Sequence, residues 1–327
     1  MLLTNGVKIA NPITIGPNGG LAASGLIQAG AGSATITGPV TIQNPALGGH
    51  FAANGGTLFV AGPIMSSVPV TVRLGPVVFS GGGIGYSQLS ISQGTIYVGA
   101  DDGIATTAVV DLSGITTASL DLAGFDQTLA GLTRVASQSA TVTNSGGAAT
   151  LNLNVSGSLL YGNDTTSQAI IAGNLSLVKS GSGTQTLSGS GANTYVGSTT
   201  VQGGVLRLAK AQFTNAVPSG NQIVVKAGGT LQLGQNHQIA DDIVDFTIQN
   251  GTFDVQAFRE DITPAIKLEG CLLKGSGGTL LARGGFVGSG VNRIESGIAL
   301  RAADTNCGRF DIRGGRQRSQ ALSSPTI

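Results

Sequence analysis

The sequence predicts an all-β protein built as a single-stranded, right-handed parallel β-helix. Three observations predict this fold. Short stretches of alternating apolar and polar residues recur along the chain, glycine occupies 53 of the 327 positions, and one strand signature returns at an interval that fits one coil of a solenoid. The 3.6-residue apolar period of an amphipathic helix is nearly missing.

The alternating stretches are the first of these observations. They include residues 13–15, 70–72, 89–91 and 151–155, and glycine, asparagine and serine separate them. Alternation at every second residue turns one face of a strand inward and the other to solvent. Many short strands with such separators are typical of an all-β protein.

The strand signature is glycine, often as a pair, then threonine or another small residue, then an apolar-x-apolar strand. It occurs at residues 55–60, 94–98, 203–208, 228–233, 251–255 and 277–280. In the last four copies the first apolar residue of the strand is Leu206, Leu231, Phe253 and Leu280, giving steps of 25, 22 and 27 residues. One β-helix coil has this length, and its inward side chains stack about 4.8 Å above those of the previous coil. Roughly twelve coils would form a rod on the order of 55–60 Å long.

An antiparallel β-sandwich or barrel is the alternative that the same alternation allows. Such a fold needs many tight hairpins, and Asn-Gly is the strongest short signal for them. Asn-Gly occurs at only four positions, Asn5, Asn18, Asn54 and Asn250, which is too few to close a dozen hairpins. The parallel β-helix is therefore preferred.

Composition and charge limit the functions open to the chain. Charged residues make up 10% and the net charge is +1, so there is no excess of basic residues for nucleic acid or an anionic membrane. Hydrophobic residues make up 41%, which argues against disorder. No apolar run is long enough for a transmembrane helix, and residues 1–8 do not resemble a signal peptide. If the protein is exported, we expect the chain to be a fragment or to use another signal.

One stretch has a more specific pattern. Residues 177–189 read LVKSGSGTQTLSG and residues 193–208 read NTYVGSTTVQGGVLRL. Together they resemble the autotransporter-associated β-strand repeat, also called the passenger-associated transport repeat. The chain departs from that pattern at Gln185, where leucine is usual, and by the extra residues 190–192. A looser similarity extends over about residues 50–260.

The resemblance implies a passenger β-helix of pectin-lyase-like architecture that supports folding and export of the passenger. It also implies an outer-membrane translocator barrel elsewhere, with no membrane insertion by this fragment. We expect residues 1–281 to form the β-helix and residues 282–327 to form an irregular tail, disordered or truncated. That tail is rich in glycine and arginine and carries Arg301, Arg309, Arg313, Arg316 and Arg318.

No group of residues predicts a catalytic, cofactor or metal site. The acidic pairs Asp101-Asp102 and Asp241-Asp242 lie in turn-like sequence and are interpreted as solvated loops. His50 and His237 have no second ligand at metal spacing. Cys271 and Cys307 are expected to be unpaired, although the sequence does not decide it.

A calcium nonapeptide is also incomplete. Residues 82–90 overlap its glycine-rich pattern, but Ser87 stands where a carboxylate should bind the ion. We therefore expect no calcium site in this stretch.

These observations favour a non-enzymatic, surface-exposed, adhesin-like stalk with an unknown surface ligand, either a glycan or a protein. A polysaccharide lyase or hydrolase is the alternative, with Asp101, Asp102, Asp241 or Asp242 as acids across a lateral groove. A trimeric fibre of the tail-spike kind is the third hypothesis.

Overall fold

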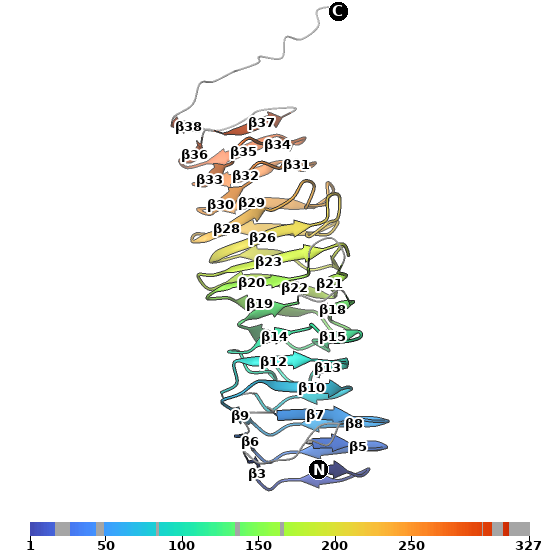
Figure 1. The fold of residues 1–327 in the computed structure, drawn as a ribbon. Coiled ribbons are helices and arrows are strands. Elements are labelled where there is room, and N and C mark those ends of the chain that lie inside the picture. Colours follow the sequence, from blue (N-terminus) through green and yellow to red (C-terminus); the bar gives the residue numbers. More distant parts are fainter. Residues whose placement is uncertain are drawn as a thin grey trace, which may run out of the picture.

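The computed structural model describes residues 1–16, 27–43, 49–82, 85–134, 138–163, 167–295, 297–302 and 310–313. These residues contain strands and no helix, and the strands stack in parallel as a β-solenoid of about 13 turns. The coils follow one another along a rod from the N-terminal to the C-terminal end (Figure 1). The predicted all-β parallel β-helix is confirmed.

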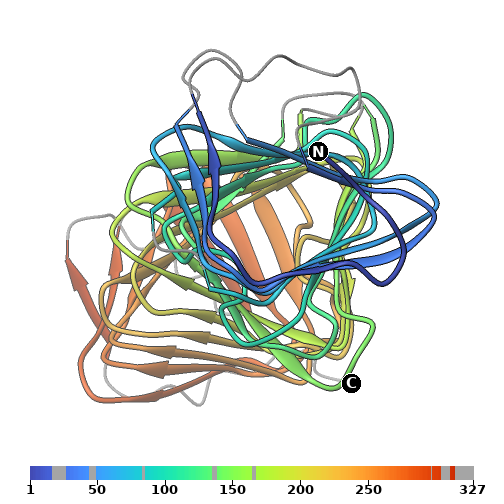
Figure 2. The same ribbon diagram turned by 90° about the horizontal axis from the view of Figure 1, so that it is seen from below.

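A complete coil contains three strand segments, and Figure 2 shows the coils end-on. The first segments are β1 (Leu2–Leu3), β4 (Ile27–Ala29), β7 (Gly49–Ala53), β10 (Val70–Leu74), β12 (Gln88–Ile91), β14 (Val109–Asp111), β17 (Gly131–Thr133), β20 (Ser158–Tyr161), β23 (Thr184–Gly189), β26 (Gly204–Lys210), β28 (Gly229–Leu233), β30 (Thr252–Asp254), β33 (Leu272–Lys274), β36 (Asn292–Glu295) and β38 (Phe310–Arg313). The second segments are β2 (Lys8–Ile9), β5 (Gly32–Ile36), β8 (Gly56–Val60), β11 (Val77–Phe79), β13 (Gly94–Val98), β15 (Ala118–Asp121), β18 (Ala140–Thr143), β21 (Ala169–Gly173), β24 (Thr194–Tyr195), β31 (Arg259–Ile262), β34 (Gly278–Ala282) and β37 (Ile298–Ala302). The third segments are β3 (Ile13–Ile15), β6 (Val40–Ile42), β9 (Ile64–Ser66), β16 (Gln127–Leu129), β19 (Ala149–Asn154), β22 (Leu175–Ser180), β25 (Thr199–Val201), β27 (Gln222–Val225), β29 (Asp245–Gln249), β32 (Ile266–Glu269) and β35 (Phe286–Ser289).

The core is a set of inward side-chain columns that run along the rod. One column joins residues of β19, β22, β25, β27, β29, β32 and β35 in register: Leu151, Leu177, Thr199, Ile223, Phe246, Ile266 and Phe286. Each of these side chains is buried. Full burial of such an aliphatic or aromatic side chain contributes about 1.5–3 kcal/mol, so the stacked columns are the main source of stability.

The strand signature marks two different segments of the coil. Leu206 pairs with Leu231, and Leu231 pairs with Phe253, as the repeat interval predicts. Phe253 then pairs with Leu273, whereas Leu280 lies in the second segment and pairs with Glu260. The predicted third step is therefore wrong, because the same glycine corner begins strands in both segments.

The stack continues beyond residue 281, where the sequence analysis placed the end of the β-helix. β35 pairs with β32, β36 pairs with β33, and β37 pairs with β34. Charged outward residues such as Arg293 and Glu295 hide the alternation of these strands in the sequence. Residues 303–309 and 314–327 of the predicted tail, including Arg309, Arg316, Arg318 and Cys307, lie outside the described residues.

The three columns of strands are each interrupted within the described coils. The third-segment column breaks between β9 and β16, the first between β17 and β20, and the second between β24 and β31. At the third-segment and first-segment breaks, one residue before the break has no strand beside it to bond to its backbone N–H and C=O groups. An inward glutamine from a later strand forms these hydrogen bonds instead. Gln127 bonds to Ile104 and Gln185 bonds to Leu132, each through both N–H and C=O at 3.0 Å. Such pairing avoids the cost of about 1–3 kcal/mol for each unsatisfied buried polar group.

Candidate functional site

The first acidic pair holds a turn against the next coil. Asp101 and Asp102 are exposed, and their Oδ1 atoms accept hydrogen bonds from the N–H groups of Asp126 (2.9 Å) and Thr128 (2.7 Å). Asp126 in turn accepts one from the N–H of Thr150 at 2.6 Å. These carboxylates therefore connect successive turns, which agrees with the loop interpretation.

The second acidic pair lies far from the first. Asp241 and Asp242 are exposed, and Asp242 Oδ2 accepts a hydrogen bond from the Ser219 hydroxyl at 2.5 Å. Six first-segment strands (β14, β17, β20, β23, β26 and β28) separate this pair from Asp101 and Asp102 in the chain, a distance on the order of 30 Å along the rod. An inverting glycosidase needs two carboxylates about 6.5–9.5 Å apart. The two pairs cannot combine into that arrangement.

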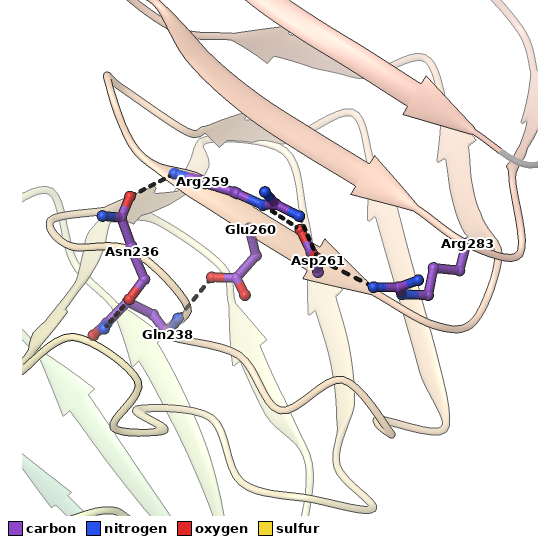
Figure 3. Close-up of polar contacts among 6 residues, drawn as sticks. All are labelled: Asn236, Gln238, Arg259, Glu260, Asp261 and Arg283. Atoms are coloured by element: carbon purple, nitrogen blue, oxygen red, sulfur yellow. Dashed lines mark hydrogen bonds and ion pairs between the residues drawn. The ribbon is translucent and has the colours of Figure 1, made fainter.

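A polar cluster lies at the break of the second-segment column, in strand β31, the turn after β34 and the loop between β28 and β29 (Figure 3). Its outer half is an ion-pair group. Arg259 donates to both carboxylate oxygens of Asp261 at 2.9 Å, and Arg283 donates to Asp261 Oδ2 at 3.2 Å. The hydrogen bonds from Arg259 lower the pKa of Asp261. Because both arginines are more than half exposed, this group contributes little to stability.

The inner half of the cluster is Glu260, which alternation turns into the core between Arg259 and Asp261. Its Oε2 accepts hydrogen bonds from the N–H groups of Gln238 (2.7 Å) and Ile239 (3.3 Å). Its Oε1 is buried without a hydrogen-bond partner. Burial raises the pKa of Glu260 to about 8. Glu260 therefore caps the break as an acceptor for two backbone N–H groups, whereas Gln127 and Gln185 each bond to both the N–H and the C=O of one residue.

His237 lies beside this cluster. Its ring stacks on Phe213 with centroids 4.7 Å apart, and its φ of 52° places the backbone in the left-handed region. His50 lies in β7, at the other end of the rod. The structure therefore does not bring the two histidines together.

Two lysines extend into the core and end on backbone carbonyls. Nζ of Lys179 donates to Ser180 O, Gly181 O and Gly203 O at 2.5, 3.1 and 3.1 Å. Burial lowers the pKa of Lys179 to about 8. The three acceptors match the three donors of an ammonium group. Lys179 thus connects two glycine corners of adjacent coils.

Lys210 has a similar environment. Its Nζ donates to Ala169 O, Ser188 O and Gly191 O at 2.7, 3.3 and 2.6 Å, and burial lowers its pKa to about 7. The side chain is almost fully buried. The ammonium group of each lysine donates to three backbone carbonyls, so both side chains connect segments of the main chain.

The described part of the chain contains no group of three His, Cys, Asp or Glu side chains able to hold a metal ion. Cys271 is a buried free cysteine. In the nonapeptide-like stretch, residues 83–84 lie outside the described residues, and the backbone carbonyl of Ser87 accepts a hydrogen bond from Val109 N–H.

Sequence reasoning did not find the buried polar residues Lys179, Lys210, Gln238 and Glu260. The signal for Glu260 was available, because it occupies an inward position between two outward charges in the run Arg-Glu-Asp-Ile at residues 259–262. In this strand the inward charge lies next to the break in the second-segment column.

The stretch at residues 177–208 joins three coils through its polar residues. Asn193 Oδ1 accepts a hydrogen bond from Ile171 N–H at 2.9 Å, and its Nδ2 donates to Ala216 O at 2.8 Å, so it contacts the coils on both sides. The Tyr195 hydroxyl bonds to Thr199 Oγ1 at 2.7 Å within the core. The lysine, asparagine and tyrosine of the pattern thus all make buried contacts.

The structure contains no helix, within the described residues, that is long and apolar enough to cross a membrane. No curated protein and no solved structure matches the chain. The model of one family does match, over residues 177–208. The predicted repeat is confirmed: these residues form a passenger-associated-transport-repeat.

Proposed function

We propose that the chain is a non-enzymatic, adhesin-like stalk of an autotransporter passenger, exposed at the cell surface. The observation that carries the proposal is the passenger-associated-transport-repeat, which lies inside a continuous β-solenoid. A translocator barrel outside this chain would anchor it in the outer membrane. The separation of the two acidic pairs supports a structural role over a hydrolase.

The structure suggests how the repeat supports export. A passenger that folds outside the cell must add coils in order, and loop closure makes each new coil costly until it contacts the previous one. Asn193 and Lys179 tie adjacent coils together through main-chain bonds. The repeat therefore acts as a staple that makes three coils form together.

Surface display tests the proposal. The chain is placed between an export signal and a translocator barrel in a Gram-negative host, and intact cells are labelled with an antibody to the rod. We expect surface labelling that added protease removes. Rod retained inside cells in which the barrel is correctly inserted would refute the proposal.

A matched pair of variants tests the role of the repeat. Lys179→Met removes the buried ammonium, whereas Lys226→Met changes an exposed lysine. Lys179→Met should lower surface display several-fold and Lys226→Met should not. Equal display of the two variants would overturn the staple mechanism while leaving surface exposure intact.

A further inference from the structure

A pocket of about 410 Å³ lies in the N-terminal half of the rod, at the corner between the first and second segments. Amide side chains line one part of it, namely Gln28, Asn54 and Gln93, and the apolar Leu74 and Ile115 line another. Ile115 is 78% exposed. The pocket therefore combines hydrogen-bonding groups with an exposed apolar wall.

An irregularity in β10 lies at the wall of this pocket. Val72 pairs with Phe51 in β7, but Leu74 pairs with Ala52, so the register shifts at Arg73. An extra residue of this kind bends a strand and changes the direction of its side chains. Arg73 and Leu74 line the pocket as a result.

An outward aromatic column lies beside the pocket on the second segments of three successive coils. Phe59 of β8 pairs with Val78 of β11, which pairs with Tyr97 of β13. Phe59 is 37% exposed, and Val78 and Tyr97 are half-buried by their neighbours in the column. Gln93 precedes Tyr97 by four residues, so the pocket lies within about 13 Å of the column along the strand.

Few charges lie on the surrounding surface. Between Lys8 and Asp101 the only charged residue is Arg73, which lines the pocket. In the next coil Asp121, which pairs with Tyr97, is buried and accepts hydrogen bonds from the N–H groups of Ala123 and Ser145, and the half-buried Asp111 accepts one from Ser113 N–H. A charged partner would lose its hydration here with little countercharge to replace it. The surface therefore fits a neutral ligand that offers apolar faces to aromatic rings and hydroxyl groups to amides.

We propose that this pocket and the aromatic column together bind a neutral, extended β-1,4-linked oligosaccharide. The sugar faces would pack on Phe59 and Tyr97, and hydroxyl groups on the pocket side of the sugar chain would bond to the amide of Gln93, at the edge of the pocket nearest to Tyr97. Phe59 and Tyr97 are two coils apart, about 10 Å, which is close to the advance of such a chain per disaccharide. This gives the proposed adhesin-like function a ligand class. Its biological meaning depends on surface exposure, but binding is measured on the purified rod and can fail independently.

The test is calorimetric titration of the purified chain with cellohexaose and mannohexaose, beside hexagalacturonate as the acidic comparison. We expect at least one neutral hexaose to bind, and both Tyr97→Ala and Gln93→Ala to weaken that binding at least tenfold. Phe213→Ala is the matched control, because Phe213 is 70% exposed at the distant second-segment break. It should leave binding unchanged, and circular dichroism verifies that each variant is folded.

Three outcomes of the titration would overturn the proposal. They are no binding of either neutral hexaose at millimolar concentration, tighter binding of hexagalacturonate, or equal weakening by Phe213→Ala. Analytical ultracentrifugation tests the competing hypothesis that a second copy of this chain, and not a sugar, binds to the aromatic column. Concentration-dependent dimers that Phe59→Ala abolishes would assign the column to self-association and also refute glycan binding.

Discussion

Replacing Glu260 by glutamine should remove a pH dependence of stability that this single side chain creates. The carboxyl group is buried, and its pKa is raised from 4.5 to about 8. In the unfolded chain it ionises near its ordinary pKa, whereas the folded chain retains the proton. The folded form is therefore favoured below pH 4.5, and that advantage is lost as pH rises towards 8.

The size of the effect follows from the two pKa values. At pH 7 the unfolded carboxyl is 2.5 pH units above its pKa of 4.5 while the folded one is still protonated. Since one unit corresponds to about 1.4 kcal/mol, the free energy of unfolding should fall by about 3 kcal/mol between pH 4 and pH 7. Glutamine retains an acceptor for Gln238 and Ile239 and does not ionise. Glu260→Gln should therefore match the wild type at pH 4 and exceed it by about 3 kcal/mol at pH 7.

Denaturant unfolding followed by circular dichroism measures this difference, and the absence of tryptophan makes fluorescence a poor probe. The denaturant concentrations at the unfolding midpoint are compared only if both proteins show the same dependence of unfolding free energy on denaturant. A change in that dependence would indicate partial unfolding of the solenoid. Asp245 and Asp261 have lowered pKa values and give stability an opposite slope at low pH. They are present in both proteins and cancel in the difference. Parallel curves from pH 4 to pH 8 would show that water reaches Glu260, and would refute the reasoning.

Three further substitutions test the other buried and exposed polar groups. Gln185→Leu should lower the free energy of unfolding by about 2 kcal/mol, because Leu132 loses both hydrogen-bond partners, while the exposed Gln202→Leu should have little effect in the same denaturant titration. Lys210→Met should abolish a rise in stability of up to about 4 kcal/mol between pH 7 and pH 10, because in this range the lysine binds its proton mainly in the unfolded chain. Thermal melts across that range measure the rise, and the same pH dependence in both proteins would mean that Lys210 is solvated in the folded chain. Asp261→Asn should change the free energy of unfolding by less than about 1 kcal/mol and make it less dependent on salt. A larger loss would mean that the ion pairs of Asp261 with the two exposed arginines stabilise the fold more than surface ion pairs usually do.

The sequence predicts the regular part of this molecule because a β-helix repeats one local rule. Glycine corners and alternating strands set the coil length, and the pairs Leu206–Leu231 and Leu231–Phe253 follow from it. The same rule fails at Leu280, because the glycine signature precedes strands of both the first and the second segment and does not distinguish between them. Segment identity depends on the length of the preceding loop, which varies between coils.

The departure of Gln185 from the family pattern shows where sequence reasoning stopped and why. The family's leucine is apolar and would fit the inward position of residue 185, so the sequence alone does not explain why glutamine occurs there. The structure gives it one, because Leu132 lies at the break between β17 and β20 and needs both a donor and an acceptor. That need arises from a residue 53 positions away, and only the stacking of coils makes the two neighbours. Gln127 and Glu260 likewise bond to backbone at the other two breaks, so these three inward polar residues mark places where a strand is absent. Lys179 differs, because its strand β22 is paired on both sides. The wild-type and glutamine forms of Glu260 test that reading directly, since an acceptor is what the break requires and a charge is what burial penalises.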